Sequence, residues 1–158
     1  MAERLYVANK NEAVRMFESD FMEFFSRVHP VIPLVLYLPV IGYMLYVSLW
    51  QRQLSIVAVT ALFSLGVLLW TLTEYLIHRY VFHYKPKSRW GKRLHYVIHG
   101  VHHDYPNDAR RLVMPPVISV PLAFLFYGVF LPVFGSLTTA VFGGMVFGYV
   151  GSVMLHYS

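Results

Sequence analysis

The 158-residue chain contains no cysteine, which excludes disulfide bonds, thiolate metal ligands and iron–sulfur clusters. Any metal site in it therefore has to use imidazole, carboxylate or water. Charged residues are also scarce, at 13%, whereas a soluble domain has about a quarter. Hydrophobic residues make up 57% of the chain. This balance predicts an all-α integral membrane protein, since helices satisfy their own backbone groups in lipid.

Four apolar runs are each close to the length that spans a membrane. They cover residues 31–49, 56–77, 112–134 and 137–155. Polar residues 51–53 separate the first two runs, and Gly135-Ser136 joins the last two. We therefore expect about four transmembrane helices arranged as two hairpins. Together with an amphipathic segment at residues 1–28, they would form one membrane domain over residues 1–158.

The basic residues are concentrated in one place. Eight of the thirteen Lys and Arg residues lie in residues 79–111, between the second and third apolar runs. Basic segments beside membrane helices mark the cytoplasmic side, so we expect this segment and the N-terminus to be cytoplasmic. This position explains the net charge of +5 better than a nucleic-acid partner, which we do not expect.

Six of the eight histidines also fall between the second and third apolar runs or at their borders. Four of them leave one face of a helix within an arc of about 100°. Neutral imidazoles in one stripe would each need a hydrogen-bond partner, and charged ones would repel each other, so the stripe favours a metal site. These four residues are His95, His99, His102 and His103.

The sequence assigns the four other histidines less firmly. His78 and His83 are five residues apart, about 140° around an α-helix, so they serve one site only if the helix ends or deforms between them. His156 ends the fourth apolar run and would return to the same membrane face. His29, directly before Pro30, is expected to be a helix-start residue and not a ligand.

Three charged residues near these histidines have two interpretations each. Glu74 lies one helical turn before His78, where it could ligate a metal or hold a ligating histidine by a hydrogen bond. The alternative is a carboxylate that reaches the membrane surface. Arg110 and Arg111 could contact an anionic substrate head group or only determine the topology. Both interpretations stay open.

Three segments carry a resemblance to a known family. They read WTLTEYLIHRYVFH at 70–83, LHYVIHGVHHDYPND at 94–108 and RLVMPP at 111–116. Together they resemble the fatty acid 2-hydroxylase branch of the membrane fatty acid hydroxylase and sterol desaturase superfamily. The resemblance implies a centre of two metal ions, nominally iron with zinc possible in purified protein, that hydroxylates the 2-position of a membrane-embedded fatty acyl substrate. Dioxygen is the co-substrate, and electrons would come from a separate electron-transfer protein.

On that resemblance, six histidines map onto metal ligands, and His95 is an additional possible ligand or a group that orients one. The six are His78, His83, His99, His102, His103 and His156. The sequence stops at Ser158, where the family continues its third histidine box and then a fourth. We expect an amino-terminal fragment of a hydroxylase, and the alternative is a short form with another role.

Two other functions stay open, a non-catalytic metal-binding remnant and a sterol or carotenoid hydroxylase or desaturase. Only about 28 residues precede the first apolar run, too few for the haem domain often fused to eukaryotic relatives. This layout favours a bacterial inner membrane over the endoplasmic reticulum. The oligomeric state is not predicted.

Overall fold

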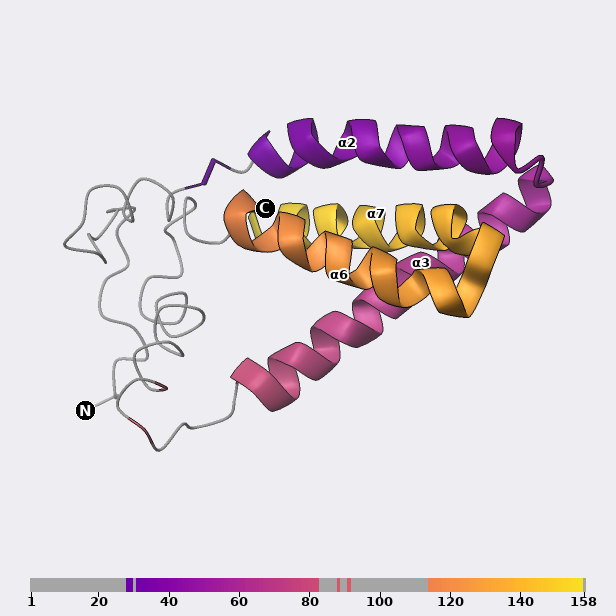
Figure 1. The fold of residues 1–158 in the computed structure, drawn as a ribbon. Coiled ribbons are helices and arrows are strands. Elements are labelled where there is room, and N and C mark those ends of the chain that lie inside the picture. The colour runs from indigo at the N-terminus through magenta and orange to yellow at the C-terminus, as the bar shows by residue number, and fades with distance from the viewer. Residues whose placement is uncertain (1–27, 30, 83–87, 89–90, 92–113, 158) are drawn as a thin grey trace.

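The computed structural model describes residues 28, 29, 31–82, 88, 91 and 114–157. All regular structure in this part of the chain is helical, which confirms the predicted all-α class. The amphipathic segment at 1–28 lies almost wholly outside the described residues. The α-helices are α2 (Val31–Tyr46), α3 (Ile56–Leu76), α6 (Pro116–Phe134) and α7 (Thr138–Tyr157), shown in Figure 1. The shorter elements are the π-helices η1 (Val47–Gln51) and η2 (Ile77–Phe82) and the 3-10 helix η4 (Gly135–Leu137).

Three helical stretches of the described chain are long and apolar enough to cross a membrane. Val31–Gln51 and Ile56–Tyr80 coincide with the first two predicted crossings. The third stretch, Pro116–Leu155, is 40 residues long because η4 continues the helical path from α6 into α7. The chain turns at η4, so α6 and α7 are separate helices (Figure 1). An integral membrane protein follows from these stretches, and the count of four crossings stays a prediction.

Local sequence signals determine where the helices begin and end. The Ser55 side chain accepts a hydrogen bond from the Ala58 backbone N–H at 3.2 Å and so caps the start of α3. Gln53 has a φ of 52° in the polar turn before this cap. Gly135 has a φ of 54°, in the left-handed region that favours glycine, and it ends α6. Both predicted turns are therefore present.

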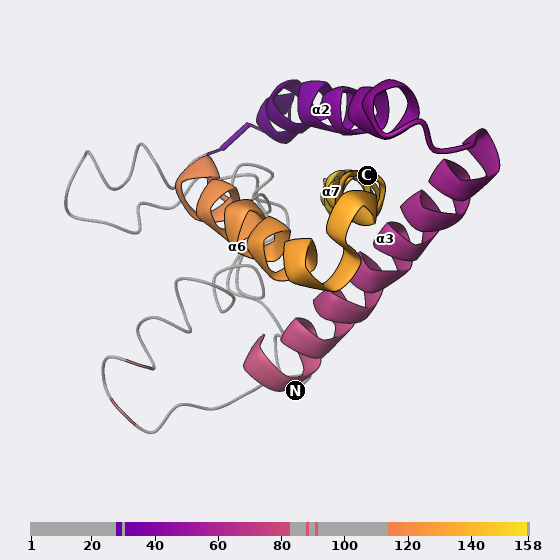
Figure 2. The ribbon, with the colours of Figure 1, turned by 45° about the vertical axis from the view of Figure 1, so that its right-hand side comes forward.

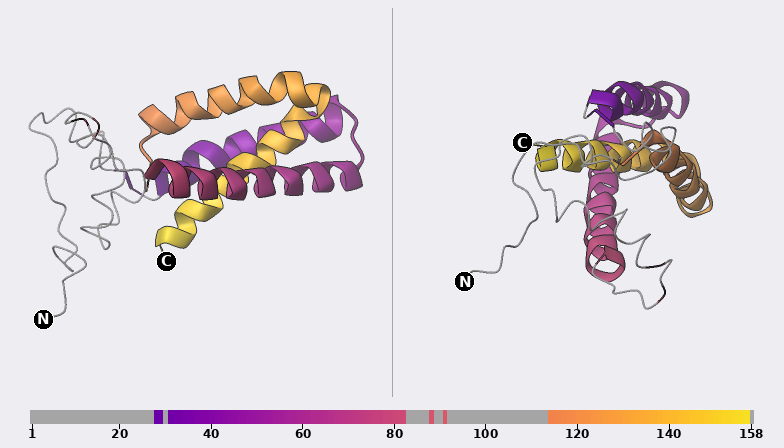
Figure 3. Two further views of the ribbon diagram at one scale, coloured as in Figure 1. Left: turned by 90° about the horizontal axis from the view of Figure 1, so that it is seen from below. Right: turned by 90° about the vertical axis from the view of Figure 1, so that its left-hand side faces the viewer.

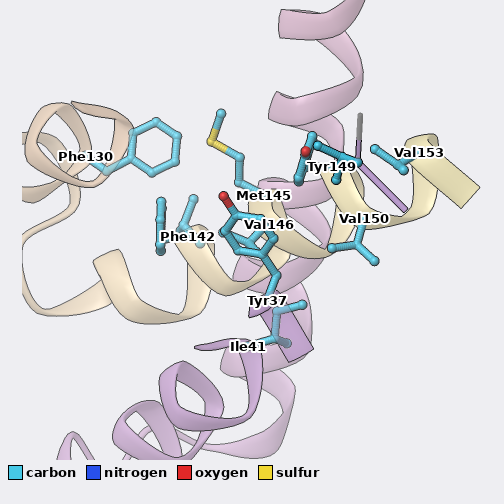
Figure 4. Packing of buried hydrophobic residues seen from close by; sticks show 11 residues of the cluster. Tyr37, Ile41, Phe130, Phe142, Met145, Val146, Tyr149, Val150 and Val153 are labelled. Atoms are coloured by element: carbon cyan, nitrogen blue, oxygen red, sulfur yellow. The ribbon is translucent and has the colours of Figure 1, made fainter. Parts of the chain in front are cut away.

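Helix α7 is the central element of the bundle. It packs against α3, α2 and α6, and Figure 2 shows it end-on between these three helices. Most of its side chains from Thr138 to Val153 are buried or half-buried, whereas α2, α3 and α6 expose many large apolar side chains outward. Figure 4 shows that the buried cluster combines α7 residues with Tyr37 and Ile41 of α2 and Phe130 of α6. A helix with apolar side chains on its outer faces suits a lipid environment.

Helices α3 and α7 cross in direct backbone contact, in the arrangement that Figure 3 shows from two sides. A methyl group built on Gly144 would lie 1.9 Å from the Phe63 carbonyl oxygen. One built on Gly66 would lie 1.9 Å from the Val141 carbonyl oxygen. Real carbon–oxygen contacts are much longer, so only glycine permits this approach. Small residues that let backbones touch are a main source of helix association in membranes.

Two hydrogen bonds between side chains link α7 to its neighbours. Ser48 of η1 and Thr139 of α7 are buried, and their hydroxyl oxygens lie 2.7 Å apart. At the other end of α7, Trp70 Nε1 donates to Ser152 Oγ at 3.1 Å. Such bonds are worth about 0.6–2 kcal/mol each in membrane bundles. They fix α7 against η1 near its beginning and against α3 near its end.

Candidate functional site

The two histidines that the structure describes at the predicted site lie at one end of the bundle. His78 is in η2, directly after α3, and His156 is in the last turn of α7. The ends of these two elements and the beginnings of α2 and α6 lie on the same side of the molecule, on the left in Figure 1. The return of His156 to the end that holds His78 was predicted from the alternating direction of the runs.

The helix changes from α-helical to π-helical geometry at His78, and a site shared with His83 would require such a deformation. The α-helical hydrogen-bond pattern ends at Leu76, and residues Ile77–Phe82 form the π-helix η2. In a π-helix the bonds run from i to i+5, so residues five apart lie roughly one turn apart instead of about 140° away. π-Helical turns inside membrane and soluble helices are frequent at functional sites. His78 is exposed at this turn, and His83 lies outside the described residues.

Glu74 is half-buried in α3, one turn before His78. Its two interpretations therefore stay open. The other predicted site residues lie outside the described part of the chain: His83, His95, His99, His102, His103, Arg110 and Arg111. Among the residues that the structure describes, no three His, Asp or Glu side chains come together as a metal site. The metal centre accordingly stays a prediction.

His29 has the local role that the sequence suggested. It lies directly before α2, and its Nδ1 accepts a hydrogen bond from the Val31 backbone N–H at 3.3 Å. A helix begins with backbone N–H groups that have no partner within the helix, and this imidazole satisfies one of them. His29 is thus a helix-start residue, as predicted.

A small, partly open pocket with a cavity volume of about 30 Å³ lies between the helices, mainly between α6 and α7. Trp70 and Tyr149, which contribute to its wall, are eight and seven residues before His78 and His156. At a rise of about 1.5 Å per residue, the pocket wall begins roughly 10–12 Å from the histidine-bearing end. The lining residues are Tyr37, Trp70, Met114, Ser119, Leu122, Ala123, Phe126, Phe142, Met145, Val146 and Tyr149.

Three hydroxyl groups lie in this wall without exposing polar surface to the pocket. Tyr37 Oη donates to Ser119 Oγ at 2.7 Å. Tyr149 Oη is buried and has no hydrogen-bond partner among the described residues. The Tyr149 ring meets the Tyr37 and Trp70 rings edge to face, with centroid distances of 5.4 and 5.2 Å. The accessible lining is therefore wholly apolar, which suits a hydrocarbon chain.

Two features of this region were not predicted from the sequence. Small residues recur every fourth position along α7, at Ala140, Gly144, Gly148 and Ser152, a visible spacing typical of a close helix interface. The aromatic residues could not be divided between lipid-facing and tunnel-lining positions. The structure divides them, since Phe126 and Phe142 line the pocket and Phe124 is 74% exposed on the outside of α6. No local pattern in the sequence carries that distinction.

These features define a class of protein: a helical integral membrane protein with a small apolar pocket between its helices and with two histidines at one end of the bundle.

Comparison with known proteins identifies the family. Residues 63–158, more than half of the chain, match the profile of the fatty acid hydroxylase family, and the chain therefore belongs to this family. The resemblance seen in the sequence is confirmed.

Individual relatives carry more specific names. A dihydroceramide fatty acyl 2-hydroxylase from Arabidopsis thaliana is 41% identical over 151 residues, which cover 92% of this chain and 62% of the relative. A fatty acid 2-hydroxylase from Rattus norvegicus is 40% identical over 167 residues, covering 91% of this chain and 44% of the relative. A solved structure of full-length scs7p, in which only the hydroxylase domain is visible, superposes with a TM-score of 0.80 at 34% identity, covering 87% of this chain and 53% of the other. The chain thus spans less than two thirds of the length of these relatives.

Proposed function

We propose that this chain is the membrane part of an enzyme that hydroxylates fatty acyl chains at the 2-position. The observation that carries the proposal is the apolar pocket, which lies beside the bundle end that holds His78 and His156. An acyl chain that contacts this apolar wall would have its polar end directed to these histidines. The names of the relatives supply the reaction and suggest a ceramide-type acyl substrate.

The proposed metal centre consists of two ions, nominally iron. When bound, such ions activate dioxygen for insertion into a C–H bond. Imidazole suits iron and zinc, and the cysteine-free donor set fits either ion. The proposed ligands are His78, His83, His99, His102, His103 and His156, with His95 and Glu74 as orienting groups or further ligands.

The described residues would contribute positioning to the reaction. The glycine contacts between α3 and α7 hold the helices that carry His78 and His156 at one separation. The change to π-helical geometry at Ile77–Phe82 would bring His83 closer to the face of His78 than a straight α-helix does, which supports a shared site. The apolar wall of the pocket would exclude water from the part of the acyl chain that contacts it.

The proposed topology has four crossings, with the N-terminus and the histidine-bearing end cytoplasmic. Pro116–Leu155 as one straight helix would measure about 60 Å, twice the apolar thickness of a bilayer, and the turn at Gly135 allows α6 and α7 to cross separately. Electrons would come from a separate protein. Arg110 and Arg111 would lie near the substrate head group, in either a bacterial inner membrane or the endoplasmic reticulum.

The test is lipid analysis of cells that express the intact gene with iron, oxygen and a reductant. We expect 2-hydroxy acyl lipids to rise. His78→Ala should abolish the rise and reduce the metal content of the purified protein, because it removes one ligand. His29→Ala is the matched control: it removes a histidine at the same end that only caps α2, so product and metal should both remain.

Three results would contradict the proposal. No rise in 2-hydroxy acyl lipids would exclude the hydroxylase activity. Bound metal without any product would favour the non-catalytic remnant. Altered sterols or carotenoids in place of acyl lipids would favour the related oxidases.

A further inference from the structure

The outward face of α3 carries an apolar stripe of four exposed leucines. At 100° per residue they lie within an arc of less than about 100° on the helix. The four are Leu65, Leu68, Leu72 and Leu76. In Figure 1 the last turns of α3 extend away from the other three helices, so no described helix covers the end of this stripe. In a membrane, lipid tails would contact it.

Arg79 follows the leucine stripe at the histidine-bearing end of the bundle. It lies in η2 and is exposed. Helix α3 is 21 residues long, which corresponds to about 30 Å, the thickness of the apolar core of a bilayer. Polar residues 51–53 precede this helix, so its two ends would lie at opposite membrane surfaces. Three residues beyond the end of α3, Arg79 would lie at the level of the lipid head groups.

Two tyrosine side chains hold the Arg79 guanidinium. Its Nη1 donates a hydrogen bond to Tyr75 Oη, one turn earlier on the same face. The guanidinium carbon lies 5.8 Å from the centroid of the Tyr75 ring and 5.5 Å from that of the Tyr80 ring. Both distances are within the range of a cation–π interaction. The rings are 51% and 64% exposed, so the cation and its two tyrosines are accessible together.

Most donors of this guanidinium stay open. The group has five N–H donors, and Tyr75 accepts from one nitrogen. Glu74 is the only acidic residue in the described part of the chain, and no ion pair joins it to Arg79. The planar fork of a guanidinium matches two oxygens of a phosphate, and stacking on aromatic rings fixes its orientation. The arrangement therefore suits a phosphate that comes from outside the protein.

We infer that Tyr75, Arg79 and Tyr80 bind the phosphate of an anionic membrane phospholipid whose acyl chains lie along the leucine stripe. A zwitterionic phospholipid carries its own cation, which competes for the phosphate, so an anionic lipid is favoured. His78 directly precedes Arg79, and the bound lipid would lie beside the histidine-bearing end. The inference goes beyond the proposed function and does not depend on it, because binding needs no turnover.

The test is a titration of the full chain in mixed micelles, with bound lipid counted by native mass spectrometry. Phosphatidylglycerol and phosphatidylcholine with identical acyl chains are the two probes. We expect phosphatidylglycerol to bind more tightly. Arg79→Gln should weaken its binding roughly 10- to 100-fold, which is the contribution of one or two hydrogen bonds to a charged group.

Two other variants distinguish this site from a simple positive charge. Arg79→Lys keeps the charge but loses the planar fork, so it should lose most of the affinity that Arg79→Gln loses. Tyr80→Leu keeps an apolar side chain but removes one ring from the cation, so it should weaken binding by about two- to fivefold. Arg79 and Tyr80 are exposed, and the fold should tolerate these changes.

The matched control is Arg52→Gln. Arg52 and Arg79 are the only Lys or Arg residues in the described part of the chain, and both are exposed. Arg52 lies at the other end of α3, and no described aromatic ring stacks on its guanidinium. The variant removes one cation from a membrane surface without removing a tyrosine-held one. Its affinity for phosphatidylglycerol should equal that of the unchanged protein.

Three results would overturn the inference. Full binding by Arg79→Lys would show that a positive charge alone is sufficient. Equal losses in Arg79→Gln and Arg52→Gln would show that any interfacial cation attracts the lipid. Equal affinity of the unchanged protein for both lipids would exclude an anionic-lipid site. A loss confined to Arg79 and Tyr80 variants would support the site whether or not 2-hydroxy acyl lipids form in the expressing cells.

Discussion

Gly144 is the position where the smallest change should have the largest effect on the fold. The substitution Gly144→Ala adds one methyl group at the crossing of α3 and α7. That group would lie 1.9 Å from the Phe63 carbonyl oxygen and 2.7 Å from its carbonyl carbon. Both atoms belong to the backbone, so no side chain can rotate to relieve the contact. The two helices would have to separate by about 1.5 Å to restore an ordinary contact of roughly 3.4 Å.

The cost follows from what that separation removes. Overpacking by one carbon in a tight interface costs about 1–3 kcal/mol, and a rigid contact belongs at the upper end. The neighbouring Gly148 would share the loss, since a methyl group built on it would lie only 2.8 Å from Trp70 Cβ, which shows how close α3 is there. We expect Gly144→Ala to lower the free energy of unfolding by about 3 kcal/mol. The control Gly128→Ala adds a methyl group to an exposed site on α6 with no atom within 4 Å. It should leave stability unchanged or raise it by up to about 1 kcal/mol.

Unfolding of the purified protein in mixed micelles, followed by the fluorescence of its three tryptophans, measures both variants. Trp70 reports directly on the crossing, because its indole N–H donates to Ser152 on α7. A Gly144→Ala protein as stable as Gly128→Ala, with unchanged tryptophan emission, would refute the close approach of α3 and α7. Equal destabilisation by both variants would show that added volume anywhere in the bundle is costly, and the crossing would lose its special role.

Two further predictions concern buried hydroxyl groups. Tyr149→Phe should raise the free energy of unfolding by about 1 kcal/mol, because it removes a buried hydroxyl that has no partner among the described residues. Tyr37→Phe should lower the free energy of unfolding by about 1 kcal/mol, because it leaves Ser119 unpaired. The same unfolding assay measures both variants, and a loss of stability in Tyr149→Phe would mean that the Tyr149 hydroxyl has a partner. In a double-mutant cycle, Ser48→Ala and Thr139→Val should show a coupling energy of about 0.6–2 kcal/mol, since their hydroxyl oxygens lie 2.7 Å apart. Additive effects would contradict that bond.

The sequence predicted the helices well because their signals are local. Apolar runs and the Gly135-Ser136 junction each act within a few residues of the chain, and α3 begins and α6 ends where they indicate. Helix α6 begins at Pro116 instead of at residue 112, because proline suits the first turn of a helix. The return of His156 to the end that holds His78 followed from the same runs. The π-helix η2 was expected only as a condition, because the spacing of His78 and His83 requires a deformation but does not say of which kind.

The pocket could not be predicted in the same way, because it depends on the angle between two helices. Phe124 and Phe126 are two residues apart in an apolar helix, and nothing in the sequence around them says which one faces the interior. That choice is made by the divergence of α6 from α7. The small residues of α7 are an intermediate case, since their four-residue spacing is visible in the sequence while the identity of the partner helix is not.

The two roles of α7 lie on different faces of the same helix. At about 100° per residue, Gly144 and Gly148 point to one side, while Phe142, Val146 and Tyr149 centre roughly 150° away. The first face fixes α3, which carries His78, and the second face lines the pocket. A rigid crossing on one face therefore allows the pocket on the other face to vary without moving the helices that carry the two histidines.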